Sequence, residues 1–162
     1  MSAATKSRES SAEPMAHVRT EFEFTVHAPY EIVAPLFGAE AERGWASDNW
    51  NPQFLHPQPA RDIEGAVFRV SRGQHQAIWV NTVLDLNLGH VQYVYVIPEV
   101  MATLIDIHIA RTGSANTKVH VTYERTALCG AANEDVRRAG TADRSSGKEW
   151  GDDIARYLTK PR

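Results

Sequence analysis

The segment that decides the fold is ANEDVRRAGTADRSSGKEWGDDIARYL, residues 132–158, close to the C-terminus. Apolar, small or inward-facing residues recur in it at steps of three and four, the period of one face of an α-helix. This inner line comprises Val136, Gly140, Asp143, Gly147, Trp150, Gly151, Ile154 and Leu158. The opposite line carries the charged residues Arg137, Arg144, Lys148, Asp152 and Arg156. The pattern predicts one long helix with a dry face and a wet face.

The glycines of this helix lie on its inner line, at positions 140, 147 and 151. Each costs about 1 kcal/mol relative to alanine in a helix interior, and each removes volume where a core helix usually fills space. We therefore expect the helix to leave a cavity above the sheet that it covers. The same glycines also permit close packing on the bulky Tyr93, Tyr95 and Tyr123, which would close that space. The sequence leaves both alternatives open.

Most of the chain before this helix is predicted to be extended. Residues 17–28 alternate between apolar and polar side chains, as a strand with one dry face does. Five more extended stretches follow Gly65, at residues 66–72, 74–86, 90–97, 101–112 and 117–128. Short turn-like breaks separate them, so consecutive strands should pair as antiparallel hairpins. A brief strand at 54–56 brings the predicted sheet to seven strands.

The alternation assigns a dry face to each long strand. The first strand presents Val18, Thr20, Phe22, Phe24 and Val26. The later strands present Phe68 and Val70; Ile78, Val80 and Leu84; Val91, Tyr93, Tyr95 and Ile97; Thr103, Ile105, Ile107 and Ile109; and Val119, Val121, Tyr123 and Arg125. In the stretch 74–86, Trp79 and Val83 make the opposite parity an open alternative.

Two short helices are predicted after the first strand. Pro29 suits the first turn of a helix over 29–37, which Pro35 breaks, and a second helix runs from 39 to 45. Residues 1–16 are small, polar and poor in apolar side chains, so we expect a disordered tail. Residues 17–162 then form a single domain, long enough to bury a core.

Composition excludes several classes of protein. The 162 residues have a net charge of −3 and no concentrated basic patch, which argues against nucleic acid as a partner. No apolar run approaches the ~18 residues of a membrane span, and no signal-peptide core is present. The single cysteine, Cys129, excludes an internal disulfide, and no neighbouring histidine or lysine activates it, so we expect a buried thiol. We predict a cytoplasmic protein without a cofactor.

The order of these elements resembles the START/polyketide-cyclase (SRPBCC) superfamily, which includes birch-pollen-allergen-like proteins. ERGW (42–45), WNP (50–52) and FLHP (54–57) look like the tryptophan-rich segment of bacterial members. Tyr93 to Pro98, VHVTY (119–123) and TAL (126–128) are similar to their last strands, and Trp150 to a tryptophan of their final helix. The resemblance spans residues 18–158. It implies the α+β helix-grip fold, a seven-stranded curved antiparallel sheet wrapped around a long C-terminal helix.

This fold implies a cavity between sheet and helix that binds a hydrophobic or aromatic molecule, lipid- or polyketide-like. Its expected lining is Trp45, Trp50, Phe68, Tyr93, Tyr95, Ile105, Ile107, Tyr123, Arg125, Asp143, Gly147, Trp150 and Gly151. The leading hypothesis is a non-catalytic binding domain, and the alternative is a polyketide cyclase, aromatase or dehydratase that acts through positioning. The superfamily shares no catalytic signature, so no catalytic residue is assigned.

A third hypothesis is an interaction module or homodimer, with exposed aromatic residues near 45–54 as the contact patch. Two observations separate the three hypotheses. A cavity below roughly 300 Å³ would exclude a sizeable ligand. Polar groups with perturbed pKa values inside the cavity would favour an enzyme.

Two charged or histidine pairs complete the candidate residues. Arg125 and Asp143 share the dry side, so they either pair there, with each other or with a ligand, or turn to water. His108 and His120 are predicted to lie opposite each other on the wet face of the sheet. They would need further ligands to hold a metal, and a solvated pair is the alternative, so no metal ligand is assigned. The sequence contains no compact zinc motif, phosphate loop or dinucleotide fingerprint.

Overall fold

The computed structural model of the protein describes residues 13–161. Most of the predicted tail, residues 1–12, lies outside this range. The residues just before the first strand are hydrogen-bonded to the C-terminal part of the chain. The backbone N–H of Ala16 donates to Asn133 Oδ1 at 2.7 Å, and the Pro14 carbonyl accepts from the Asn133 side-chain amide at 3.1 Å. These bonds join the start of the sheet to the start of the C-terminal helices.

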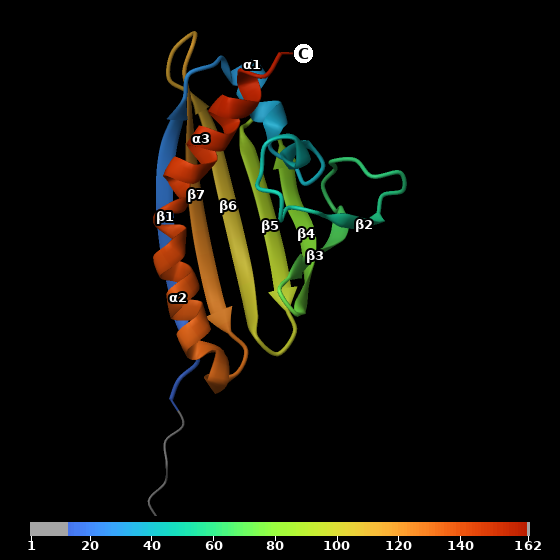
Figure 1. Ribbon diagram of the computed structural model, residues 1–162, viewed down its shortest axis with the longest axis vertical. Coiled ribbons are helices and arrows are strands. Elements are labelled where there is room, and N and C mark those ends of the chain that lie inside the picture. Colours follow the sequence, from blue (N-terminus) through green and yellow to red (C-terminus); the bar gives the residue numbers. More distant parts are fainter. Residues whose placement is uncertain (1–12, 162) are drawn as a thin grey trace, which may run out of the picture.

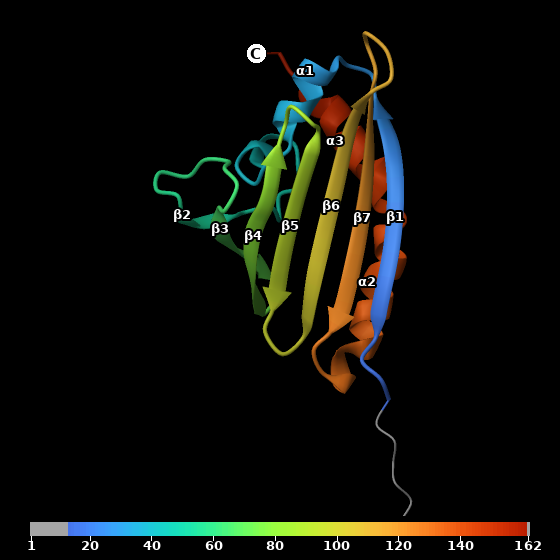
Figure 2. The same ribbon diagram turned by 180° about the vertical axis from the view of Figure 1, so that it is seen from behind.

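Seven strands form one antiparallel sheet, as predicted. They are β1 (His17–Val26), β2 (Gln53–His56), β3 (Val67–Arg72), β4 (His75–Asp85), β5 (His90–Ile97), β6 (Met101–Arg111) and β7 (Thr117–Ala127). Their order across the sheet is β1-β7-β6-β5-β4-β3-β2, so the first strand closes against the last. Figure 1 shows the helices on one face, and in Figure 2 no element formed by residues 13–161 covers the opposite face.

The predicted dry faces are confirmed in the long strands except β4. There the buried residues are Ala77, Trp79 and Asn81, so the assignment of Ile78 and Val80 to the dry face is wrong. The cause is a β-bulge between Asn81 and Val83, which shifts the alternation by one residue. Beyond the bulge Leu84 pairs with the buried Val91, and its assignment was correct.

The long C-terminal helix is present and has one interruption. It consists of α2 (Asn133–Asp143) and α3 (Ser146–Leu158), with a turn at Arg144 and Ser145 between them. The short helices after β1 are α1 (Tyr30–Val33) and the 3₁₀ turns η1 (Ala34–Leu36) and η2 (Ala41–Gly44); η3 (Gly130–Ala132) precedes α2. None of the helices formed by residues 13–161 is long and apolar enough to cross a membrane.

The glycines of α2 and α3 pack against β1, which contradicts the expectation that they leave open space. A Cβ on Gly140 would lie 2.5 Å from Val18 Cγ1, and one on Gly147 would lie 3.0 Å from Phe22 Cδ2. Gly151 is less tightly packed, with Phe24 Cδ2 at 3.4 Å. The missing side chains let the two helices lie close to the first strand, so the glycines do pack tightly, but against β1 rather than against Tyr93, Tyr95 and Tyr123 as the alternative had it.

Two separate coverings lie over the inner face of the sheet. In Figure 1, α2 and α3 run along β1 and β7, whereas the segment between α1 and β3 lies over the other end of the sheet. The coverings meet where Trp45, in the segment between α1 and β3, contacts Trp150 of α3, with ring centroids 5.7 Å apart. Gly44 also contacts the ring of Tyr157 on α3. The centre of the sheet therefore lies beneath the junction of the two coverings.

Gly140 and Gly151 provide a matched test of the packing on β1. We expect Gly151→Ala to raise the free energy of unfolding by up to about 1 kcal/mol, because alanine is the better helix former. Gly140→Ala should lower it by about 1–2 kcal/mol, because overpacking against Val18 outweighs that gain. Chemical denaturation of both variants measures the difference. Equal stabilisation by the two substitutions would contradict the packing on β1.

Candidate functional site

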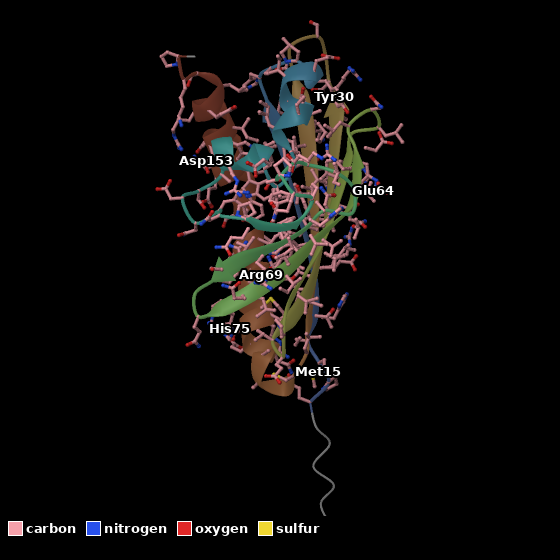
Figure 3. All side chains as sticks on the ribbon, turned by 90° about the vertical axis from the view of Figure 1, so that its right-hand side faces the viewer. Met15, Tyr30, Glu64, Arg69, His75 and Asp153 are labelled. Atoms are coloured by element: carbon pink, nitrogen blue, oxygen red, sulfur yellow. The ribbon has the colours of Figure 1, made fainter. Side chains whose placement is uncertain are left out.

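A cavity of about 210 Å³ lies where the two coverings meet above the sheet. Its floor is formed by buried residues of β5, β6 and β7, namely Tyr93, Ile105, Ile107 and Tyr123. Its walls carry Glu42, Trp45, Ala46, Trp50, Trp79, Trp150 and Asp153, and its mouth carries the exposed Ser47, Arg72 and Glu149. Figure 3 shows Asp153 on α3, beside the segment that follows α1.

Seven of the thirteen residues predicted to form the site line this cavity. They are Trp45, Trp50, Tyr93, Ile105, Ile107, Tyr123 and Trp150. The other six lie elsewhere. The rings of Phe68 and Tyr95 each stack with the ring of Trp79, at centroid distances of 5.7 and 4.2 Å. Gly147 and Gly151 pack on β1, and Arg125 and Asp143 bind each other.

Glu42 is the functional candidate that sequence reasoning missed. Its side chain lies on the cavity wall and the residue is only 7% exposed. The Tyr93 hydroxyl donates to Glu42 Oε1 at 3.1 Å, and the backbone N–H of Gly38 donates to the same oxygen at 3.4 Å. Burial raises the pKa of the Glu42 carboxyl from 4.5 to about 8, although these two hydrogen bonds oppose the shift. At neutral pH the carboxyl is therefore mostly protonated.

The inward direction of Glu42 follows from a spacing of three. Ala39, Glu42 and Trp45 lie three residues apart, and Ala39 and Trp45 are both buried. A 3₁₀ helix has three residues per turn, so side chains at this spacing share a face. The burial of Ala39 and Trp45 at this spacing is the sequence signal for an inward Glu42, which the motif ERGW (42–45) alone does not give.

The segment that carries Glu42 is held firmly in place. The carboxylate of Asp62 accepts the backbone N–H groups of Glu40 at 2.8 Å and Ala41 at 2.9 Å. The same carboxylate fills the space where a side chain on Gly38 would lie, and Gly38 has a φ of +140°. Farther along, the indole N–H groups of Trp45 and Trp50 donate to the backbone carbonyls of Leu36 and Ala39 at 2.7 and 2.9 Å. The tryptophans thus form a fixed wall.

Two further lining groups keep unused hydrogen-bonding capacity. Burial raises the pKa of the Tyr123 hydroxyl, so it stays protonated, and no side chain between residues 13 and 161 forms a hydrogen bond with it. The indole N–H of Trp79 is buried and has no partner within the same range. A buried donor without a partner costs about 1–3 kcal/mol. The Trp79 nitrogen exposes less than 1 Å² of surface, so its N–H does not face the open part of the cavity.

Arg125 and Asp143 form a buried ion pair, the first of the alternatives considered for them. Arg125 Nε donates to Asp143 Oδ2 at 2.7 Å and Nη2 donates to Oδ1 at 2.7 Å, with side chains 9% and 8% exposed. Nη1 donates to Thr103 Oγ1 at 3.3 Å and to the Tyr95 hydroxyl. Burial is the largest single influence on the pKa of Arg125 and lowers it, but the hydrogen bonds to Asp143 and the charge interactions with Tyr95, Asp143 and Tyr123 together outweigh it, so the net shift is upward. The pair anchors the end of α2 to β7, outside the cavity lining.

The predicted contact patch near residues 45–54 is mostly inside the protein. Trp45 and Phe54 are 6% and 8% exposed, and Trp50 is half-buried against Phe68 and Trp79. Leu55 is the large apolar side chain of this stretch that stays exposed. Cys129 is also half-buried rather than fully buried.

The solved structures that are similar to this chain share its architecture. An uncharacterised protein from Rhizobium leguminosarum is 19% identical with a TM-score of 0.62, over 90% of this chain and 96% of that one. Norcoclaurine synthase from Thalictrum flavum, in complex with dopamine and hydroxybenzaldehyde, is 11% identical with a TM-score of 0.61, over 91% of each chain. A protein from Thermobifida fusca is 12% identical with a TM-score of 0.62, over 89% and 97%.

The chain has the helix-grip fold that these solved structures share. No protein-family model matches its sequence, and no curated protein is similar to it in sequence. Identities this low establish the helix-grip fold alone and transfer no activity. Within the helix-grip architecture, the cavity of this chain lies in the expected place, between the curved sheet and the C-terminal helix.

The buried pair can be tested by breaking it and by replacing it. Asp143→Asn should lower the free energy of unfolding by about 3–5 kcal/mol, because it leaves the buried Arg125 guanidinium without a counter-charge. The double variant Arg125→Met with Asp143→Leu should lose much less, because no buried charge remains. Denaturant unfolding of the three proteins gives both values. A double variant as unstable as Asp143→Asn would contradict the desolvation argument.

The raised pKa of Glu42 makes stability depend on pH. Between 4.5 and about 8 the unfolded state is ionised while the folded state keeps the proton, so the free energy of unfolding falls as pH rises. The whole decrease is on the order of 5 kcal/mol. Glu42→Gln removes the titration, so its stability relative to the unmodified protein should rise from about pH 5 to about pH 8 and then level off. Parallel pH profiles of the two proteins would show that Glu42 does not titrate as described.

Proposed function

We propose that the protein binds a small aromatic molecule with a single ring in the cavity between η2, α3 and the centre of the sheet. The observation that carries this proposal is the lining itself. Four tryptophans and two isoleucines surround hydroxyl and carboxyl groups that converge on the same small space. An apolar pocket with a few convergent polar groups is the usual form of a small-molecule site.

The size of the cavity narrows the class of ligand. A cavity of about 150 Å³ accommodates benzene, so 210 Å³ has room for one ring with short substituents. Drug-sized ligands occupy roughly 300 Å³ or more. The lipid- or polyketide-like ligand expected from the superfamily would need a wider opening between Trp45 and Trp150. A single-ring ligand needs none.

The charges of the lining narrow the class of ligand further. The carboxyl groups of Glu42, Glu149 and Asp153 line the cavity, whereas Arg72 is the basic residue of the lining. A ligand that is neutral or cationic therefore fits better than an anion. Its polar atoms would accept from the Tyr123 hydroxyl or exchange hydrogen bonds with Glu42. Norcoclaurine synthase, whose similar structure contains dopamine and hydroxybenzaldehyde, holds single-ring aromatic molecules in the same fold.

A second candidate function is acid–base catalysis on the bound ligand. Glu42 favours it, because its pKa of about 8 lies near neutral pH, where a carboxyl group can both donate and accept a proton. Next to a carbonyl ligand, the ionised form would remove a proton from the carbon beside the carbonyl, and the electron pair of the C–H bond would move into the enolate. The hydrogen bond from Tyr93 would hold the carboxyl in position.

Phenylacetone tests binding and proton transfer in one experiment, because it has one ring and exchangeable C–H bonds beside a carbonyl. At roughly 0.5 kcal/mol for each of about ten non-hydrogen atoms, the expected Kd is about 0.2 mM. Titration in D2O, followed by NMR, should shift the indole signals of the lining and replace ligand hydrogens with deuterium. Glu42→Gln should retain binding and slow the exchange by about 100-fold.

A matched pair of variants in which phenylalanine replaces alanine locates the ligand. Ala46→Phe fills the cavity wall and should abolish binding, whereas Ala110→Phe adds the same ring to an exposed position of β6 and should not. Binding that survives Ala46→Phe, or no binding by any single-ring neutral or cationic probe, would refute the proposed site. Binding without exchange would leave the binding function and remove the catalytic one.

A further inference from the structure

A cluster of two histidines and one aspartate lies on the outer face of the sheet, the face turned to the viewer in Figure 2. His90 on β5 is the direct cross-strand partner of His108 on β6. Asp106 lies two residues before His108, so strand alternation places it on the same face. The cavity lies on the opposite face, so this cluster is independent of the site proposed above.

The three side chains already converge on one point. His90 Nε2 lies 2.7 Å from Asp106 Oδ1, and His108 Nε2 lies 2.9 Å from Asp106 Oδ2. The two imidazole rings are stacked, with centroids 4.6 Å apart and an angle of 9° between their planes. Each residue offers one ligand atom, and these atoms lie within 4.8 Å of one another. Both rings therefore present a nitrogen to the same carboxylate.

Neighbouring side chains hold the aspartate in this position. Gln92 Nε2 donates to Asp106 Oδ1 at 3.0 Å, and the Thr82 hydroxyl donates to Gln92 Oε1 at 2.9 Å. The chain of hydrogen bonds crosses three adjacent strands, β4, β5 and β6. Groups that orient the ligands in this way are typical of metal sites, where they fix the direction of the carboxylate.

We propose that His90, Asp106 and His108 bind a divalent transition-metal ion such as Zn²⁺. Two imidazoles and a carboxylate are a donor set that zinc accepts, and water would occupy the remaining position on this open face. Tetrahedral zinc with bonds of about 2.0–2.1 Å separates its ligand atoms by about 3.3 Å. The two distances from the imidazole nitrogens to the carboxylate, 2.7 and 2.9 Å, need to widen slightly, and the ligand atoms, which lie within 4.8 Å of one another, need to gather to that separation.

The histidine partner differs from the one that the sequence indicated. His120 does lie opposite His108, as predicted, but its Nε2 lies 3.4 Å from Glu21 Oε2 on the neighbouring β1. His90 completes the cluster instead, through the β5–β6 register. The two histidines are thus supplied by the strands on either side of one hairpin.

Isothermal titration of the full chain with ZnCl2 at pH 7.5 tests the site. We expect one Zn²⁺ per chain, and His90→Ala and His108→Ala should each weaken binding at least tenfold. His75→Ala and His120→Ala remove other histidines of the same sheet and should leave the affinity unchanged. MgCl2 should not bind measurably, because magnesium prefers a full shell of oxygen ligands. Circular dichroism of each variant verifies that it is folded.

Cobalt provides a second readout that loss of structure cannot imitate. Co²⁺ bound by two nitrogens and a carboxylate should produce visible absorption bands. These bands should be absent in His108→Ala, and they should disappear from the unmodified protein when excess Zn²⁺ displaces the cobalt. No zinc binding, or zinc binding that survives both His90→Ala and His108→Ala, would overturn the proposal. Loss of binding in His120→Ala would move the site to β6 and β7 and overturn it equally.

Discussion

The buried pair of Arg125 and Asp143 is the interaction on which the arrangement of the helices depends. It is the place where a charge on the inner face of the sheet meets a charge on the helical layer, through two hydrogen bonds of 2.7 Å. Asp143 is the last residue of α2, and the turn at Arg144 and Ser145 follows directly. The helix is thus held at its interruption. From there α3 leans towards α1 (Figure 1), which brings Trp150 to Trp45 and closes the cavity.

Glu42 is the opposite case, a buried carboxyl group that no cation between residues 13 and 161 neutralises within hydrogen-bonding distance. A carboxyl group in this position lowers stability at neutral pH, and the protein meets that cost by keeping the proton. Tyr93, Tyr123 and Trp79 add further polar atoms to a space that apolar residues could fill. Cores that serve packing alone do not collect such groups, so their concentration at one cavity supports a role in recognising a ligand.

The sequence predicted those features that depend on local periodicity. Alternation identified the strands and the inward direction of Tyr93, Ile105 and Tyr123, and the period of the C-terminal helix placed Asp143 on the same side as Arg125. The sequence-based prediction failed where a residue's surroundings depend on which surfaces of the fold meet. The glycine line of α2 and α3 has the correct face, but spacing alone does not say that this face lies against β1. Glu42 was missed because a charged side chain is expected in water, and its burial depends on the tertiary contacts with Tyr93 and the backbone of Gly38.

The bulge in β4 has a consequence for the chemistry of the cavity. Without it, alternation counted back from Leu84 would place Ile78 and Val80 on the inner face and Trp79 in water. One extra residue at Asn81–Val83 exchanges aliphatic side chains for an indole ring that Trp50, Phe68 and Tyr95 surround. The length of a single strand therefore decides whether this wall of the cavity is aliphatic or aromatic. A one-residue deletion at this point would replace Trp79 with aliphatic side chains in the cavity wall, although no residue of the lining is itself substituted.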